Sequence, residues 1–325
     1  METDTTAGAA QDYRDLREGA RAVDLAHWCL LRLEGPDAGA FLQGMATQDL
    51  EGVPAESGTA LPTLFLTEKG RPVALAWVSV AADGSSAIVI ADDGARQTLR
   101  PHFEKFRIME EVEFAGPEGM PRIVGIAGPQ RAALLGTLAM STPGAIAVDA
   151  APLSFLIVPA GIPESALPAG GSESALPRFA GPAAFEAWRL AVGLPRSGID
   201  FDLDRIATEL DLPDAISSTK GCYVGQEVVA RTSSRGQVRR RRVGFRFDWT
   251  GEPIPRGAEI ASGGKVAGFV TSTAQEPGAR EGFGMGYFST EALEGAVSGM
   301  PPPAFEVLAA GARSGASLRV APWPL

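Results

Sequence analysis

The closing stretch, residues 237–325, carries the sequence pattern that most restricts how this chain can fold. Glycine and proline turns separate short apolar or alternating runs, which fall at 243–249, 258–261, 265–273, 284–288, 305–309 and 317–320. Such alternation is typical of strands with one buried face, and Ser262-Gly263-Gly264 is a hairpin signal. These residues predict a separate antiparallel barrel or sandwich.

Residues 1–236 mix helical and strand patterns without the regular repeat of a doubly wound sheet, which predicts an α+β arrangement. After a frayed start at 1–11, we expect helices at 12–25, 38–45, 129–140 and 183–192, and strands at 27–33, 64–80, 86–91, 122–127, 146–148 and 155–158. Asp37 is a candidate cap for the helix that follows it. We therefore expect two domains, residues 1–236 and 237–325.

The charge balance is acidic. A formal net charge of −10 argues against capture of nucleic acid over a wide surface, so we do not expect tRNA as a partner. The run Arg239-Arg240-Arg241-Arg242 is the local exception. It fits either the solvated start of a strand or a basic rim for a polyanionic ligand.

Cysteine usage and the ends of the chain indicate a cytoplasmic protein. Cys29 and Cys222 are the only cysteines, which is not a disulfide framework. Cys29 lies in an apolar run and is expected in the core, and the spacings that signal zinc are absent. No apolar run is long enough to span a membrane, and the acidic N-terminus lacks the features of a signal peptide. A repeat of Glu-Ser-Ala-Leu-Pro at 164–168 and 173–177 is interpreted as a surface loop.

Residues 217–232 have the composition of a ligand-binding loop that leads into a short helix. A cysteine at the start of a helix meets the positive end of the dipole, which favours the thiolate, and the Lys220 ammonium would act in the same direction. Gly221 and Gly225 would let the backbone approach a ligand. From these residues alone, Cys222 is either a reactive thiol or a buried structural cysteine beside a capping lysine.

The octapeptide Lys-Gly-Cys-Tyr-Val-Gly-Gln-Glu at 220–227 resembles the signature of the YgfZ family of folate-binding proteins. That family is related to the T-protein, the aminomethyltransferase of the glycine cleavage system. Each position matches the pattern lysine, glycine, cysteine, aromatic, any residue, glycine, glutamine, glutamate. The resemblance continues at 229–231 and 236–240 and, more weakly, at 35–49, 193–195 and 198–200.

The resemblance implies two interleaved T-protein-like α+β subdomains around a central channel, followed by a C-terminal antiparallel β-barrel. It implies tetrahydrofolate or another reduced folate as cofactor, and a role with iron–sulfur cluster proteins or their assembly machinery. Cys222 would be the catalytic thiol. The folate site would include Lys220, Gly221, Tyr223, Gln226, Glu227 and Arg231. Carboxylates of a folate tail could pair with Arg231, Arg189 or the 239–242 run.

Two acids of T-proteins have no counterpart in this chain. Ala74-Leu75 stands where T-proteins carry an acidic pair, and Ala191 stands where an acid holds the pterin. The first loss argues against glycine-cleavage chemistry, and the second bears on the strength or mode of folate binding. One alternative is a folate-dependent one-carbon transferase with an altered substrate, in which Cys222 or Asp200 replaces the missing acid. Another is a binding module that has kept the fold without folate.

Overall fold

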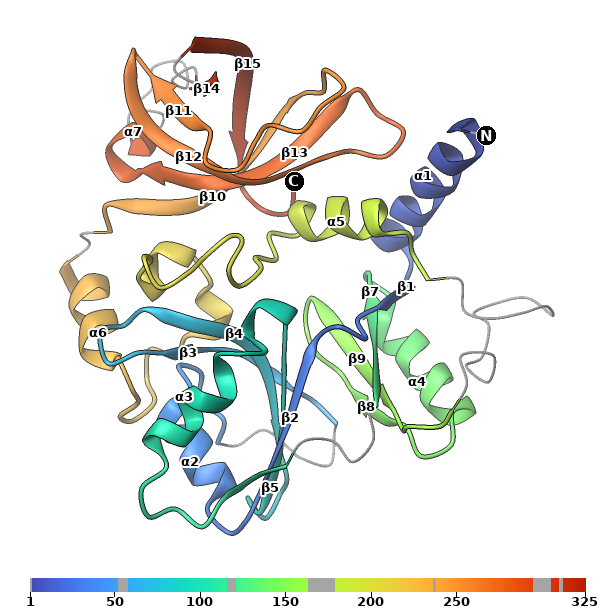
Figure 1. Ribbon diagram of the computed structural model, residues 1–325, viewed down its shortest axis with the longest axis vertical. Helices are drawn as coiled ribbons and strands as arrows, with labels where there is room; N and C mark the ends of the chain where they lie inside the picture. Colours follow the sequence, from blue (N-terminus) through green and yellow to red (C-terminus); the bar gives the residue numbers. More distant parts are fainter. Residues whose placement is uncertain are drawn as a thin grey trace. The chain divides into compact units, whose positions relative to one another are not determined.

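The computed structural model describes residues 2–51, 58–115, 121–162, 179–235, 238–294, 305–309 and 312–325 (Figure 1). The chain forms two compact units, each assembled from separate stretches of sequence. The first unit comprises Met1–Tyr13, Gly181–Asp211 and Glu227–Leu325, and the second comprises Arg14–Ala180 and Leu212–Gln226. The domain boundary at 236/237 and the repeat at 164–177 lie outside the described residues, so both stay predictions.

The second unit contains two antiparallel sheets. One sheet has the strand order β3-β4-β5-β2-β6 and the other has the order β1-β7-β9-β8. Their strands are β1 Arg21–Asp24, β2 Cys29–Glu34, β3 Leu61–Leu66, β4 Pro72–Val80, β5 Ser86–Ala91, β6 Glu113–Ala115, β7 Arg122–Ala127, β8 Ile146–Val148 and β9 Leu153–Val158. The strand patterns read from the sequence are therefore confirmed over most of this unit.

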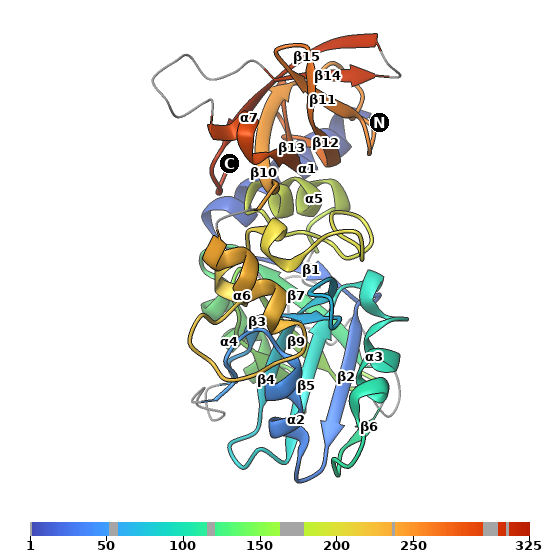
Figure 2. The same cartoon turned by 90° about the vertical axis from the view of Figure 1, so that its left-hand side faces the viewer.

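Helices cover both sheets of the second unit. Helices α2 (Ala38–Met45) and α3 (Leu99–Phe106) lie against the five-stranded sheet, where Phe41, Met45 and Phe103 enter one apolar core (Figures 1 and 2). Helix α4 (Arg131–Ser141) packs on the four-stranded sheet. Short 3₁₀ helices occur at η2 Asp93–Ala95 and η5 Pro213–Ala215.

Two expectations near the N-terminal half are wrong. Helix α1 spans Glu2–Glu18 rather than 12–25, because residues 21–24 pair with β7 as strand β1. The Gly19 amide donates to the Asp15 carbonyl at 2.9 Å, where the helix ends. Asp37 makes no side-chain cap on α2, since its carboxylate accepts the Glu111 amide at 2.8 Å instead.

The first unit contains a closed antiparallel barrel with the strand order β10-β13-β12-β11-β14-β15. Closure decides between the two expected architectures in favour of the barrel. The alternating glycines of β13 make room for aromatic rings of the neighbouring strand, since a Cβ on Gly284 would lie 2.2 Å from the Phe245 ring. The barrel strands are β10 Arg240–Asp248, β11 Glu259–Ser262, β12 Lys265–Gln275, β13 Glu281–Ser289, β14 Phe305–Ala309 and β15 Ala312–Ala321.

The remaining elements of the first unit are helices. They are α1 as far as Tyr13, α5 Pro182–Ala191, η4 Ala207–Leu210 and α7 Thr290–Glu294, together with all but the first residue of α6 Gln226–Arg235. Among the described residues, no helix combines the length and the apolar character required to cross a membrane. The cytoplasmic location stays a prediction.

Candidate functional site

Lys220 anchors the segment that we call the cysteine loop, residues 217–225. Its Nζ donates to the backbone carbonyls of Gln43 at 2.8 Å, Ala46 at 2.7 Å and Gln48 at 2.8 Å. These carbonyls lie at and just beyond the C-terminal end of α2, where carbonyl groups lack helical partners and attract a cation. An ammonium has three donors, so Lys220 has none left over for a ligand.

The environment of Lys220 also alters its protonation. Burial lowers the pKa of the Lys220 ammonium to about 8, while the nearby charges of Asp49 and Glu51 oppose this change. The Lys220 ammonium donates into the carbonyls of the 43–48 corner, and its activation of Cys222 stays a prediction. The hydrogen bonds of Lys220 to these carbonyls support the alternative in which it is a capping lysine.

Further hydrogen bonds fasten the loop and the residues before it to the same corner. The Val224 amide donates to the Gly44 carbonyl at 3.0 Å, and the Ser217 amide donates to the Thr47 carbonyl at 2.9 Å. Thr47 Oγ1 donates to the Ala215 carbonyl at 2.6 Å. The backbone on both sides of Cys222 is therefore fixed to one rigid element.

Gly225 ends the loop and needs to be glycine. Its φ is +85°, and a Cβ there would lie 2.6 Å from the Thr67 carbonyl oxygen. Gly221 differs, because a Cβ at that position would meet no atom within 4 Å. Only one of the two glycines is thus required by the backbone, and the space beside Gly221 is open.

Cys222 is exposed and carries a free thiol, whereas Cys29 is buried as predicted. Burial raises the pKa of the Cys29 thiol, and the structure leaves Cys222 as the accessible cysteine. Helix α6 begins only at Gln226. The expected position of Cys222 at a helix start is therefore wrong, and the helix dipole does not act on it within the first turn.

The other predicted site residues lie on the loop or on the helix after it. Tyr223 is half-buried, and the Lys220 Nζ lies 5.4 Å from the centre of its ring. Gln226 accepts the Tyr223 amide at 3.4 Å through Oε1. The structure thus brings together Lys220, Gly221, Cys222, Tyr223 and Gln226, while Glu227 and Arg231 are exposed on α6.

The positions of the missing acids are apolar and buried. Ala74 and Leu75 lie inside strand β4, and Ala191 is the last residue of α5. None of them offers a carboxylate. Across the described ranges, no group of three or more His, Cys, Asp or Glu side chains is arranged to hold a metal ion.

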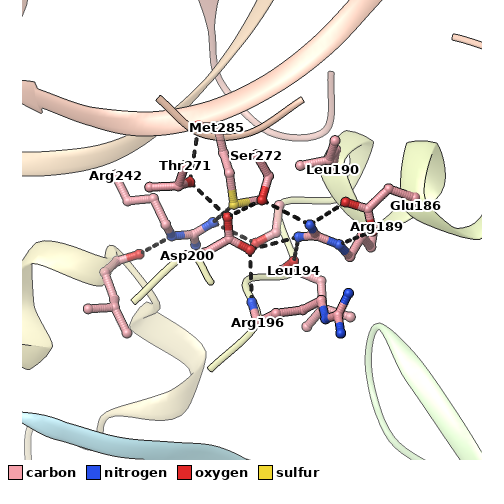
Figure 3. A network of polar contacts seen from close by, with 12 residues as sticks. Glu186, Arg189, Leu190, Leu194, Arg196, Asp200, Arg242, Thr271, Ser272 and Met285 are labelled. Carbon is pink, nitrogen blue, oxygen red and sulfur yellow. Dashed lines mark hydrogen bonds and ion pairs between the residues drawn. The ribbon is translucent and has the colours of Figure 1, made fainter. Parts of the chain in front are cut away.

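Asp200 is the centre of a buried polar network in the first unit (Figure 3). Its Oδ2 accepts from Arg189 Nη1 at 2.8 Å and from the Arg196 amide at 3.0 Å. Its Oδ1 accepts from Thr271 Oγ1 at 2.7 Å and from Ser272 Oγ at 2.6 Å. Burial alone would raise the pKa of Asp200, but Arg189, the two hydroxyls and the amide hold it below its usual value.

Two of the arginines that could pair with a folate tail, Arg189 and Arg242, are buried as well. Arg189 pairs with Glu186 and Asp200 and donates to the Leu194 carbonyl, which engages its whole guanidinium. Arg242 donates to the carbonyls of Leu210 and Gly193, each at 2.8 Å. Arg189 therefore has no free donor for a folate tail, and Arg242 is buried away from solvent.

Comparison with known proteins agrees with this fold. Residues 240–299 match the family model described as the glycine cleavage T-protein C-terminal barrel domain. A crystal structure of the glycine cleavage system aminomethyltransferase T from Bartonella henselae superposes with a TM-score of 0.78 at 21% identity. The match covers 97% of this chain and 89% of that one, so the predicted fold class is confirmed.

Curated relatives match most of the chain. The tRNA-modifying protein YgfZ of Edwardsiella ictaluri is 28% identical over 249 residues, which cover 72% of this chain and 73% of that protein. The chain is YgfZ-like. The human mitochondrial iron–sulfur cluster assembly factor IBA57 is 26% identical over 78% of this YgfZ-like chain and 70% of its own length. A putative chloroplastic transferase of Arabidopsis thaliana is 26% identical, and the match covers 84% of this chain and 66% of that protein.

The residues that hold the cysteine loop in place could not be identified from the local sequence pattern. Gln43, Thr47 and Gln48 hold the cysteine loop through Lys220 and the residues before it. Their segment, 41–49, belongs to the weak N-terminal resemblance, and this resemblance is the sequence feature that could have indicated them. Nothing in the local pattern indicated that Asp200 would be buried against residues of β12.

Proposed function

We propose that this protein binds a reduced folate beside the cysteine loop and supports iron–sulfur enzymes through the thiol of Cys222. The observation that carries the proposal is a free, exposed thiol on a backbone that Lys220 and Val224 fix to the 43–48 corner. A reactive group held on a rigid support is suited to act on a bound partner. The name of human IBA57, an iron–sulfur cluster assembly factor, supports the same direction.

The residues of the loop fit the needs of a pterin ring, which are hydrogen-bond partners for its amide edge and an aromatic or apolar wall. The side-chain amide nitrogen of Gln226 makes no hydrogen bond to the described residues and is free to donate. The Tyr223 ring offers the wall, and the open space at Gly221 admits a ligand to the backbone. A folate would be held here without the acids of T-proteins, since Ala74, Leu75 and Ala191 supply none.

The transferase alternative loses the carboxylate of its two candidates, Cys222 and Asp200. All acceptor positions of Asp200 are filled by Arg189, Arg196, Thr271 and Ser272. A carboxylate engaged in this way has no free position to take a proton from a substrate. Incubation with methylamine-type donors and tetrahydrofolate should therefore yield no methylene- or methyl-tetrahydrofolate above background.

Three measurements test the proposal. Calorimetry with tetrahydrofolate should give saturable heat for the wild type and for Cys222→Ser, because the thiol is not one of the pterin's partners. In cells that lack the native gene, Cys222→Ser should fail to restore iron–sulfur enzyme activity, whereas the buried-thiol control Cys29→Ser should restore it. Alkylation by iodoacetamide should modify Cys222 in the folded protein and leave Cys29 unmodified.

The two parts of the proposal can fail separately. Absence of heat or saturation with tetrahydrofolate removes the folate part. Full restoration of enzyme activity by Cys222→Ser removes the thiol part and favours a binding module that acts by protein contact.

A further inference from the structure

A second cluster of chemically active side chains lies in the first unit, on strands β12 and β13 of the barrel. Phe269 and Tyr287 face each other across these strands, and their rings stack at 5.4 Å. Their strand neighbours Val270 and Phe288 point into the barrel core. Because side chains alternate along a strand, the Phe269 and Tyr287 rings lie on the opposite face, outside that core.

Arginines surround this aromatic pair. The Arg205 guanidinium lies 5.3 Å from the centres of both rings, and the Arg240 guanidinium lies 5.7 Å from the centre of Phe269. Arg256 approaches from the turn before β11 and lines the pocket described next. Arg205 has one acidic neighbour, Glu209 at 3.7 Å. Within the described parts of the chain, the side chains of Arg240 and Arg256 form no hydrogen bond or ion pair.

A pocket of about 130 Å³ opens between the Asp200–Arg205 segment and this face of the barrel. Its walls include Arg205, Arg256, Gly257, Phe269 and Tyr287. Pockets for drug-sized ligands span roughly 300–1,000 Å³, so this one is too small for a whole folate. Its size suits a single polar group such as a phosphate or a carboxylate.

The Tyr287 hydroxyl is the second indication of a ligand. The side chain is fully buried, yet its hydroxyl has no hydrogen-bond partner within the described residues. Buried hydroxyls in folded proteins are nearly always paired, so this pocket-lining residue carries a donor that lacks its expected partner.

The acids near the pocket do not cancel its positive charge. Asp200 is neutralised by Arg189 and saturated with hydrogen bonds. Asp202 lines the rim, is exposed, and accepts the Asp204 amide at 2.9 Å. Arg256 in the pocket lining and Arg240 over the Phe269 ring have no acidic partner among the described residues, and Asp202 is the exposed carboxylate of the lining.

We propose that this pocket binds one oxyanion group, a phosphate or a carboxylate, between Arg205 and Arg256, with Arg240 nearby over the Phe269 ring and the Tyr287 hydroxyl as a neutral donor. Guanidinium groups pair with both kinds of oxyanion in bidentate geometry, and the aromatic pair holds Arg205 and Arg240 in place. The site uses no residue of the cysteine loop, so it does not depend on the proposed function.

Calorimetry on the full chain at low ionic strength tests this site with inorganic phosphate and with glutarate. Saturable heat is expected with at least one of them, and the tighter binder identifies the ligand as a phosphate or a carboxylate. Arg256→Ala and Arg240→Ala should each weaken binding about tenfold, since each removes a charge-assisted contact. Tyr287→Phe keeps the ring and removes the donor, and it should weaken binding as well.

Arg241→Ala is the matched control. Arg241 is exposed and adjacent to Arg240, but it alternates to the other side of β10 and lies over neither ring. This variant should bind the anion like the wild type. The absence of saturable heat with both anions would overturn the proposal, and so would an equal loss in Arg241→Ala, which would indicate diffuse charge in place of a site.

Discussion

Lys220 and Cys222 lie two positions apart on the cysteine loop, yet their side chains have opposite environments. Lys220 is buried, and its ammonium is enclosed by carbonyls. Cys222 is exposed. The sequence places the cation and the thiol close together, but the carbonyls that accept from Lys220 belong to residues far away along the chain. The supporting role of Lys220 and the exposure of Cys222 could therefore be distinguished only in the structure.

The protonation of Lys220 can be measured directly. Burial places its pKa in the folded chain at about 8, below the ordinary value of 10.5. The folded chain then releases this proton before the unfolded chain does, so the free energy of unfolding rises with pH between those values. With ¹³C-labelled lysine, one resonance should titrate near pH 8 and be missing in Lys220→Arg. A midpoint near 10 for that resonance would contradict the assignment.

At the scale of elements, the turn from the cysteine loop into α6 depends on Gly225. Gly225→Ala forces a side chain into a left-handed conformation and against the Thr67 carbonyl, which should lower the free energy of unfolding by about 3 kcal/mol. Gly221→Ala is the control and should change it by less than about 0.5 kcal/mol, since that site is open. Urea unfolding measures both, and equal effects would show that the turn tolerates a side chain.

Helix α5 and strand β12 are joined by the Asp200 network. Asp200→Ala leaves Arg189 buried with one acid fewer, which should cost about 4 kcal/mol of unfolding free energy. The exposed neighbour Asp202→Ala serves as control and should stay near the wild type. An effect below about 1 kcal/mol in Asp200→Ala would mean that the network contributes little to stability.

The same network gives the protein a defined response to acid. The pKa of Asp200 is lower in the folded chain than its ordinary value of 3.8. Its stabilising contribution is therefore complete above that value and is lost as the pH falls through the folded-state pKa. Denaturant midpoints measured down the acid range should fall more steeply for the wild type than for Asp200→Asn.

At the scale of the whole molecule, sequence patterns predicted the elements that depend on neighbouring residues and missed those that depend on distant partners. The alternation in 265–273 and 284–288 indicated strands of a barrel or sandwich, and closure of the barrel decided between them. Residues 21–24 were assigned to a helix because their strand form depends on pairing with residues 124–127. The burial of Arg189 and Asp200 could not be predicted, because their partners include Ser272, which is remote in sequence.

The charge of the whole molecule also bears on nucleic acid. Relatives carry the name tRNA-modifying protein, but this chain has a net charge of −10, and its Arg239–Arg242 run is divided by the fold. Arg242 is buried against carbonyls, which leaves Arg239, Arg240 and Arg241 as the exposed arginines of the run. So short a basic segment on an acidic chain releases few counterions from tRNA, and binding through it should be weak at physiological salt. Electrophoretic mobility shift at 150 mM salt should show no saturable complex with tRNA, and a submicromolar complex that persists at this salt would contradict the argument.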